Sequence, residues 1–249
     1  MKRPVLAANW KMNNDPTAAR MFMDAFLGGY RPRDERTVVI FPPAVDLTIV
    51  AAAIAARADV LAGIQNIHWA EKGAFTGEIS ASMARDAGAK MVLVGHSERR
   101  HVFGETDAQC ARKCQAAARA GLSFMLCVGE KIEQREAGET ERVVTHQLRE
   151  GLSQTSNLIS TDFLIAYEPV WAIGTGLTAS AGDASAIHTL LRSELRQMIG
   201  TRGNEIPILY GGSVNASNAA SLLAADEVDG LLVGGASVDA ASWLAIAQT

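Results

Sequence analysis

Short, uninterrupted apolar runs recur along the chain at nearly even intervals, and turn residues bound each of them. The runs are Val5–Ala8, Thr37–Phe41, Val60–Ile64, Met91–Val94, Ser123–Val128, Phe163–Tyr167, Pro207–Tyr210 and Gly230–Val233. Apolar runs of this length without polar alternation are typical of strands that are buried on both faces. The pattern therefore predicts eight buried strands.

Between these runs, apolar residues follow helical spacing. Asp15 is expected to cap the first helix, with Pro16 at its first position, and Ala18, Met21 and Phe22 then fall on one face. Further helices are expected at Asp46–Arg57, Ser80–Gly88, Asp107–Gly121, Thr140–Gly151, Ala184–Gly200 and Ser217–Ala225. The charged stretch Glu130–Arg142 is typical of a solvated connection and helix face.

Alternating strands and helices predict parallel strands, because parallel neighbours need a crossover element between them. Such units either close into a barrel or open into a doubly wound sheet. No G-x-G-x-x-G follows the first predicted strand, where a dinucleotide-binding sheet would carry it. No Pro/Ser-rich linker divides the chain. We therefore expect one α/β domain over residues 1–249, a closed (β/α)8 barrel.

Composition excludes several other classes of protein. The chain has 249 residues, 48% of them hydrophobic, and a net charge of -4, which favours a globular protein and gives no electrostatic case for nucleic-acid binding. No stretch approaches the length of a membrane span, and the first residues turn polar too early for a signal peptide. The three cysteines and five histidines show no metal-ligand spacing. We expect a cytoplasmic protein with no membrane contact and no bound metal.

Polar residues at the ends of predicted strands carry the candidate chemistry, because catalysis in such barrels occurs at the C-terminal mouth. Asn9 and Lys11 follow the first strand and share a face, and Lys11 supplies a fixed positive charge for an anionic substrate. His96 follows the fourth strand, and a helical turn beginning after it would keep the imidazole neutral. Glu168 ends the sixth strand, where desolvation is expected to raise its pKa and basicity.

Glycine-containing loops complete this mouth. After Glu168, stiff Pro169 and apolar Val170–Ile173 lead to Gly174 and Gly176, the composition of a hinged lid that excludes water. Paired glycines also follow the last two strands. They stand in Gly211-Gly212-Ser213 and in Gly234-Gly235, where backbone amides can approach a phosphate group.

Other polar residues near the strand ends favour structural roles. Glu98 and Arg99 are expected to form ion pairs behind the reacting groups. Cys127 closes the fifth strand and is expected to be a small buried hydrophobe. Cys110 and Cys114, four apart on a helix, are expected to face the core.

These segments together resemble the triosephosphate isomerase family over the whole chain. The matching motifs are Ala8–Asn13, Gly73–Glu78, Gly95–Arg100, Ala166–Gly176, Tyr210–Val214 and Gly234–Ser237. The lid motif is the most specific of them. The resemblance implies interconversion of dihydroxyacetone phosphate and D-glyceraldehyde 3-phosphate through an enediol(ate), in glycolysis and gluconeogenesis, without a cofactor.

The resemblance also implies roles for individual residues. Glu168 would move the proton, His96 would polarise and protonate the oxygens, and Lys11 would hold the anion, with Asn9 positioning it. The phosphate would bind the backbone of Gly174, Ser213, Gly234 and Gly235. Members of the family are homodimers in which a loop like Gln65–Glu78 lies beside the partner's active site, so Thr76 would brace the Lys11 region. Leu177, where the family commonly has lysine, is a departure at the far hinge of the lid.

Two alternatives remain at this stage. Another phosphate-binding barrel isomerase, acting on a phosphoribosyl intermediate, would keep the two paired-glycine loops but has no reason to carry the Glu168–Gly176 lid. A catalytically inactive barrel that serves as a binding protein would be expected to lack Lys11, His96 or Glu168, and all three are present.

Overall fold

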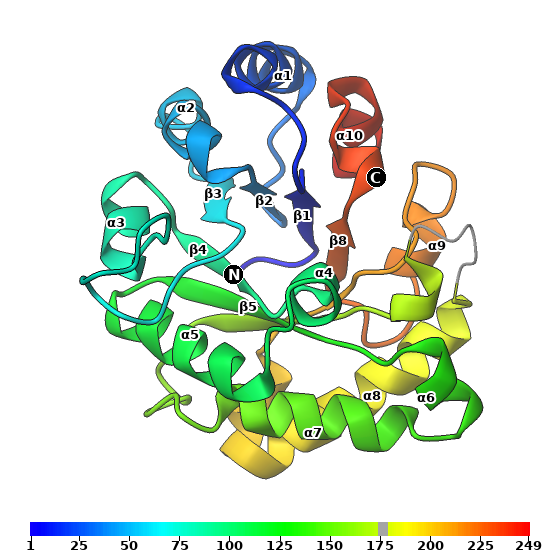
Figure 1. Ribbon diagram of the computed structural model, residues 1–249. Coiled ribbons are helices and arrows are strands. Elements are labelled where there is room, and N and C mark those ends of the chain that lie inside the picture. Colours follow the sequence, from blue (N-terminus) through cyan, green and yellow to red (C-terminus); the bar gives the residue numbers. More distant parts are fainter. Residues whose placement is uncertain (174–178) are drawn as a thin grey trace.

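The computed structural model describes residues 1–173 and 179–249, and its centre is a closed barrel of parallel strands (Figure 1). The strands are β1 (Val5–Asn9), β2 (Thr37–Phe41), β3 (Val60–Ile64), β4 (Met91–Val94), β5 (Ser123–Val128), β6 (Phe163–Tyr167), β7 (Ile208–Tyr210) and β8 (Gly230–Val233). Val5 pairs with Thr37 of β2 on one side and with Gly230 of β8 on the other, which closes the ring. The predicted barrel is confirmed, and the open sheet is excluded.

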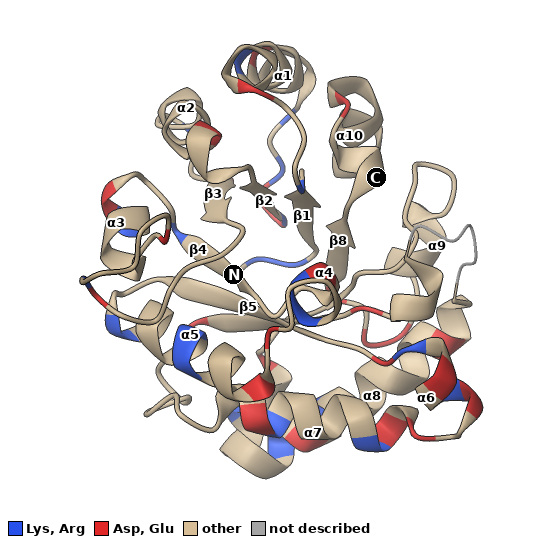
Figure 2. Ribbon diagram, viewed as in Figure 1, with Lys and Arg blue, Asp and Glu red and all other residues tan. Residues whose placement is uncertain are grey.

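Helices surround the barrel (Figure 1). They are α1 (Pro16–Gly29), α2 (Leu47–Ala53), α3 (Ala81–Asp86), α4 (Ser97–His101), α5 (Asp107–Arg119), α6 (Ile132–Glu136), α7 (Thr140–Leu152), α8 (Ala181–Ile199), α9 (Ala219–Leu223) and α10 (Ala240–Ala247). Charged residues lie mainly on helices and loops (Figure 2). Within the described residues, no helix has the length and apolar character needed to cross a membrane.

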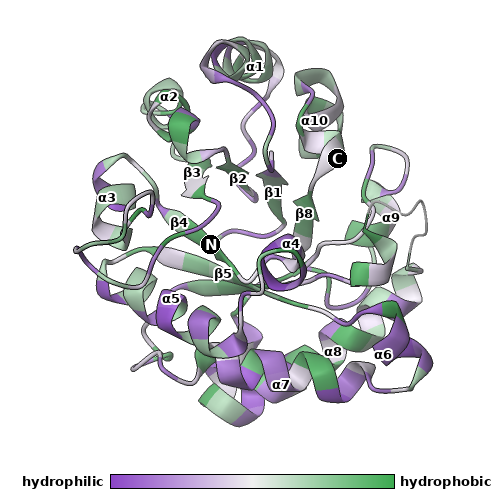
Figure 3. Ribbon diagram, viewed as in Figure 1, coloured by the Kyte–Doolittle hydropathy of each residue, from purple (hydrophilic) through white to green (hydrophobic). Residues whose placement is uncertain are grey.

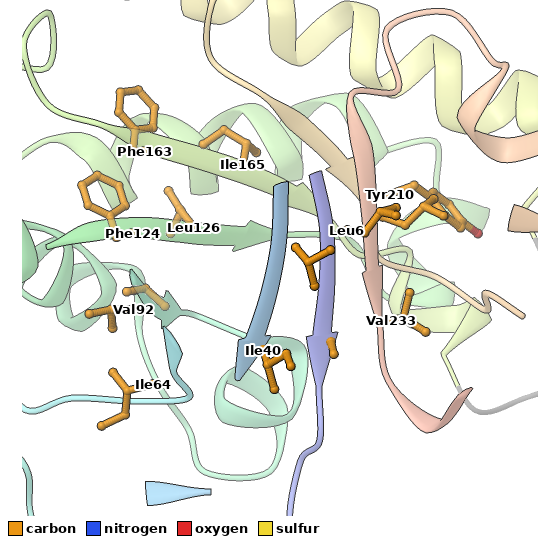
Figure 4. Packing of buried hydrophobic residues seen from close by; sticks show 14 of the residues in the cluster. Leu6, Ile40, Ile64, Val92, Phe124, Leu126, Phe163, Ile165, Tyr210 and Val233 are labelled. Carbon is orange, nitrogen blue, oxygen red and sulfur yellow. The ribbon is translucent and has the colours of Figure 1, made fainter. Parts of the chain in front are cut away.

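Strand side chains alternate between two apolar layers, since successive residues of a strand point to opposite faces. Val5 and Ala7 of β1 pack with Val39, Leu93 and other residues in a small cluster, which fills the barrel. The intervening residues belong to a larger cluster that the helices cover. Figure 3 shows the hydrophobic strands, and Figure 4 shows ten labelled members of the larger cluster, among them Leu6 and Phe124. Burial on both faces explains the absence of polar alternation.

Local capping interactions fix where the helices begin. Asp15 caps α1 by accepting hydrogen bonds from the backbone N–H groups of Thr17 and Ala18, as predicted. The helix expected from Ala184 instead begins at Ala181, because Ser180 and Asp183 form a reciprocal capping box. Helix α10 was not predicted, although Asp239 caps it by accepting from the Ser242 N–H.

His188 of α8 makes the stability of the fold sensitive to acid. Its side chain is fully buried, its Nδ1 lies 2.9 Å from the Glu227 carbonyl oxygen, and its Nε2 has no partner among the described residues. Burial lowers its pKa from 6.5 to about 4. Between pH 6.5 and pH 4, His188 is therefore protonated in the unfolded chain but neutral in the folded chain. The free energy of unfolding is highest above pH 6.5 and decreases as the pH falls towards 4.

We expect His188 to account for a loss of about 2 kcal/mol in the free energy of unfolding between pH 7 and pH 5. Urea unfolding at a fixed protein concentration measures this loss. His188→Asn keeps a side-chain N–H donor but does not titrate. Its free energy of unfolding should therefore fall by about 2 kcal/mol less than that of wild type over the same pH interval. Equal losses in the two proteins would show that His188 is not responsible.

Candidate functional site

A pocket of about 310 Å3 opens at the C-terminal ends of the barrel strands. It brings together residues that follow five different strands. Its walls contain Asn9, Lys11, His96, Glu168, Ile173, Gly211, Gly212, Ser213, Val214, Leu232, Gly234, Gly235 and Ala236. The structure thus gathers nearly every residue that the sequence singled out. The predicted lid residues Gly174, Gly176 and Leu177 lie outside the described residues.

The backbone of Lys11 is held in an unusual conformation. Its φ angle is 55°, in the left-handed region that non-glycine residues rarely adopt. Two side chains hold it there. Asn9 Oδ1 accepts from the Lys11 N–H at 3.0 Å, and Gln65 Nε2 donates to the Lys11 carbonyl at 2.8 Å. Asn9 therefore positions Lys11 within the pocket wall.

The Lys11 ammonium group forms an ion pair with Glu98. Its Nζ lies 2.7 Å from Glu98 Oε1, and the Glu98 side chain is 44% exposed. Gly234 leaves room for the Lys11 side chain, because a Cβ atom at that position would lie 3.1 Å from Lys11 Cε. A positive charge is thus fixed beside the glycines that follow β8.

The two predicted acid–base groups are in direct contact. His96 Nε2 lies 3.0 Å from Glu168 Oε1, and the Ser97 N–H donates to Glu168 Oε2 at 2.9 Å. Both side chains are almost fully buried. Gly211 allows this approach, because a Cβ atom at that position would lie 2.9 Å from Glu168 Cγ. Both carboxylate oxygens of Glu168 therefore have donors in this arrangement.

The hydrogen bonds of His96 are those of a neutral imidazole. Helix α4 begins directly after it, and His96 Nδ1 accepts from the Glu98 N–H at 3.3 Å. A ring nitrogen that accepts carries no proton, so the single N–H is on Nε2 and points at Glu168. The helical turn predicted after His96 is confirmed, and it fixes the tautomer.

The pKa directions expected from sequence are wrong for this arrangement. Burial raises the pKa of Glu168, but attraction to His96 and hydrogen bonds from His96, Ser97 and Cys127 lower it by more. Burial lowers the pKa of His96, but attraction to Glu168, the hydrogen bond with it and attraction to Glu98 together raise it by more. The sequence showed the desolvating strand and the helical turn. It did not show that the two groups touch, which reverses both shifts.

Backbone amides in the paired-glycine loops are free to bind an anion. Within residues 1–173 and 179–249, the N–H groups of Ser213, Gly234 and Gly235 have no protein acceptor. All three residues line the pocket that Lys11 enters. Free amides beside a fixed ammonium group form a site for a phosphate or a carboxylate.

Apolar residues after Glu168 approach the same pocket. Ile173 lines it, as expected for the beginning of a lid. Behind it, the Trp171 indole N–H donates to Glu130 Oε1 at 2.8 Å, and the Tyr167 hydroxyl donates to the same oxygen at 3.2 Å. Fully buried Glu130 thus anchors the segment that leads out of β6.

The remaining sequence predictions have clear outcomes. Arg99 Nε lies 2.7 Å from Glu105 Oε2, so the expected ion pairs of Glu98 and Arg99 are confirmed. Cys127 is fully buried inside the barrel, where burial raises the pKa of its thiol well above the ordinary value. Cys110 and Cys114 are also buried, as predicted. Gln65 was missed, and its place directly after β3 was the available signal.

This arrangement suits proton transfer at a carbon next to a carbonyl group. A carboxylate base, a neutral imidazole N–H and an ammonium group surround one pocket, and free amides line it beside the ammonium group. A neutral N–H and a nearby cation stabilise an oxygen on which negative charge develops. The free amides would hold an anionic group of the same substrate.

Comparison with known proteins finds close relatives over the full length. The sequence profile described as Triosephosphate isomerase matches residues 4–249. The triosephosphate isomerase of Moorella thermoacetica is 45% identical over 251 residues, which cover 99% of this chain and 98% of the relative. That of Marinobacter nauticus is 45% identical over 254 residues, covering 100% and 98%. The crystal structure of triosephosphate isomerase from Bartonella henselae superposes with a TM-score of 0.88 at 38% identity, covering 98% of this chain and 97% of that one.

Proposed function

The chain belongs to the triosephosphate isomerase family, and from that membership we propose that it interconverts dihydroxyacetone phosphate and D-glyceraldehyde 3-phosphate in glycolysis and gluconeogenesis. The observation that carries the assignment is the contact between Glu168 and His96 in one pocket with Lys11. An isomerase of this kind moves one proton between neighbouring carbons, so it needs a base, an electrophile for the oxygens and a charge to hold the substrate.

Glu168 is the base in this proposal. Its carboxylate takes a proton from C1 of dihydroxyacetone phosphate, the electron pair moves to the carbonyl oxygen, and an enediol(ate) forms. The carboxylic acid then returns the proton to C2. His96 gives its Nε2 proton to the C2 oxygen and takes the proton of the C1 hydroxyl, so that the C1 oxygen becomes the carbonyl oxygen of the aldose and His96 ends neutral. The Lys11 ammonium group stabilises the negative charge on these oxygens.

Substrate binding must first separate Glu168 from His96. In the free protein the His96 Nε2–H is bonded to the Glu168 carboxylate, so neither the N–H nor that carboxylate oxygen can contact the substrate. A substrate oxygen at His96 Nε2 would replace the carboxylate. Glu168 then loses the attraction that lowers its pKa while its burial remains, so its basicity rises. His96 loses its contact with Glu168, which is the main cause that raises its pKa, so its burial then favours the neutral imidazole.

The substrate phosphate binds at the paired-glycine loops, close to Lys11, in this proposal. The free N–H groups of Ser213, Gly234 and Gly235 are the donors that support it. The family resemblance adds Gly174 to this set. Apolar residues between Val170 and Ile173 exclude water when the substrate is bound, which protects the intermediate from loss of its phosphate.

A coupled assay for conversion in both directions tests this function. Purified protein should interconvert the two triose phosphates in the presence of EDTA and without added nucleotide. Circular dichroism would establish that the sample is folded. Folded protein without measurable conversion would exclude the proposal.

We further propose that the enzyme is a cytoplasmic homodimer in which residues 1–249 form one domain. Barrel closure between β1 and β8 joins the two ends of the chain, which supports a single domain. Three free cysteines suit a reducing compartment. Large apolar side chains are exposed after the neighbouring strands β1 to β4, which supports an interface there. These side chains are Met12, Val45, Phe75, Met83, Val102 and Phe103.

We expect Thr76→Arg to produce monomers of low activity. The exposed loop residue Thr76 lies near Phe75 in this surface and, by family resemblance, would meet the Lys11 region of the partner. A long cation there would be buried without a counter-charge. Light scattering and the coupled assay measure the outcome, and Thr201→Arg, at another exposed threonine, is the matched control. An unchanged dimer would contradict the interface, and a fully active monomer would contradict the bracing role.

A further inference from the structure

A second large pocket lies on the outside of the barrel, between α3 and α5. Figure 1 shows these two helices as neighbours around the barrel. Its volume is about 550 Å3, within the range of small-molecule sites. It shares no residue with the catalytic pocket. Its lining includes Trp69, Glu71, Arg85, Arg112, Gln115 and Arg119. We call this pocket the α3–α5 groove.

Positive charge dominates this groove. Arg85, Arg112 and Arg119 line it, and Glu71 is the only carboxylate among the lining residues. Blue basic positions are visible on α5 in Figure 2. Arg112 and Arg119 have no ion pair within the described part of the chain. Arg85 has one carboxylate partner, its neighbour Asp86, at 3.3 Å on the exposed surface. Among the described residues, Arg112 and Arg119 thus lack the counter-charges that ordinary surface ion pairs supply, and Arg85 has a single exposed one.

Fixed elements hold these side chains around one space. Arg112, Gln115 and Arg119 lie on one face of α5, at spacings of three and four residues. Arg85 Nη1 donates to the Ala120 carbonyl at 3.2 Å, which holds it at the same end of the groove as Arg119. The guanidinium group of Arg112 lies over the Trp69 ring, 5.5 Å from its centre. The opposite end of the groove therefore has its own oriented arginine.

We propose that the α3–α5 groove binds a small organic bis- or polyphosphate. Guanidinium groups match phosphate oxygens with paired N–H donors, and Arg112 keeps its edge donors while it stacks on Trp69. Arg112 and Arg119 are seven residues apart, about 10 Å along the helix, so one ligand needs two separated anionic groups to reach both. Gln115 Nε2 donates to the Gln154 carbonyl at 2.6 Å, which holds that side chain between the two arginines.

Isothermal titration calorimetry with sodium tripolyphosphate as the probe tests this site. Arg112→Glu/Arg119→Glu reverses both charges, and Lys90→Glu/Arg142→Glu makes the same change at exposed positions outside the groove. All three proteins keep the catalytic pocket, so a difference between them reports on the groove. We expect the groove variant to lose one binding event per chain, or at least tenfold in affinity, while wild type and control behave alike.

A second ligand and a milder double variant test the chemical class of the ligand and control for misfolding. Citrate should bind the groove at least tenfold more weakly than tripolyphosphate; equal affinity would replace the phosphate assignment by a general polyanion site. If the charge reversals impair folding, Arg112→Gln/Arg119→Gln removes both positive charges without introducing negative ones. Identical titrations of wild type and folded groove variant would overturn the proposal. Isomerase activity is expected to be unchanged in these variants, so failure here leaves the proposed function standing.

Discussion

Glu168→Gln is expected to lower kcat by about two to four orders of magnitude, which is the typical contribution of a positioned general base. Glutamine keeps the size of the side chain but cannot take a proton from carbon. The pocket, Lys11 and the free amides of the phosphate side are unchanged, so KM should stay within a few-fold. Steady-state kinetics in both directions measures the effect. Binding of glycerol 3-phosphate, which cannot be isomerised, reports separately on the pocket.

Glu168→Asp serves as the matched control for this substitution. It retains a carboxylate but moves it back by one methylene group, so its activity should lie between wild type and Glu168→Gln. Equal losses of ligand affinity and of kcat in Glu168→Gln would indicate that Glu168 shapes the pocket and is not the base. The same conclusion would follow if Glu168→Asp were as inactive as Glu168→Gln.

Lys11→Met is the second substitution with a large expected effect. It removes the cation that would stabilise both the bound anion and the enediolate, so kcat should fall by about 10²- to 10³-fold and KM should rise. The unfolding free energy should change little, because the Glu98 partner is 44% exposed and can be solvated when its lysine is gone. Kinetic constants and urea unfolding of the same samples separate the two effects.

Glu98→Gln tests whether the ion pair or the lysine itself matters. It removes the partner at 2.7 Å but leaves the ammonium group in the pocket, so its kinetic effect should be far smaller than that of Lys11→Met. A comparable loss of kcat in both variants would mean that the ammonium group works only when Glu98 holds it in place. In wild type, higher ionic strength should raise KM, because salt screens attraction between the partly exposed Lys11 ammonium group and the phosphate.

The local features of the fold could be predicted from sequence because they depend on neighbouring residues. Continuous apolar runs located the strands, and Asp15 with Pro16 located the start of α1. Helix ends were less accurate where capping decides them, as at Ser180. Helix α10 is almost wholly apolar and has only a weak amphipathic pattern, so the Asp239 cap was its main signal.

The sequence by itself determined which residue types stand at the strand ends, and hence the candidates Lys11, His96 and Glu168. Tertiary structure alone decided how these groups touch. Because β4 and β6 both pair with β5, His96 lies close enough to contact Glu168 at 3.0 Å, and that contact reverses the pKa directions expected from each segment alone. The physical reason is that desolvation follows from a residue's own surroundings, whereas Coulombic and hydrogen-bond shifts depend on distances between segments far apart in the chain.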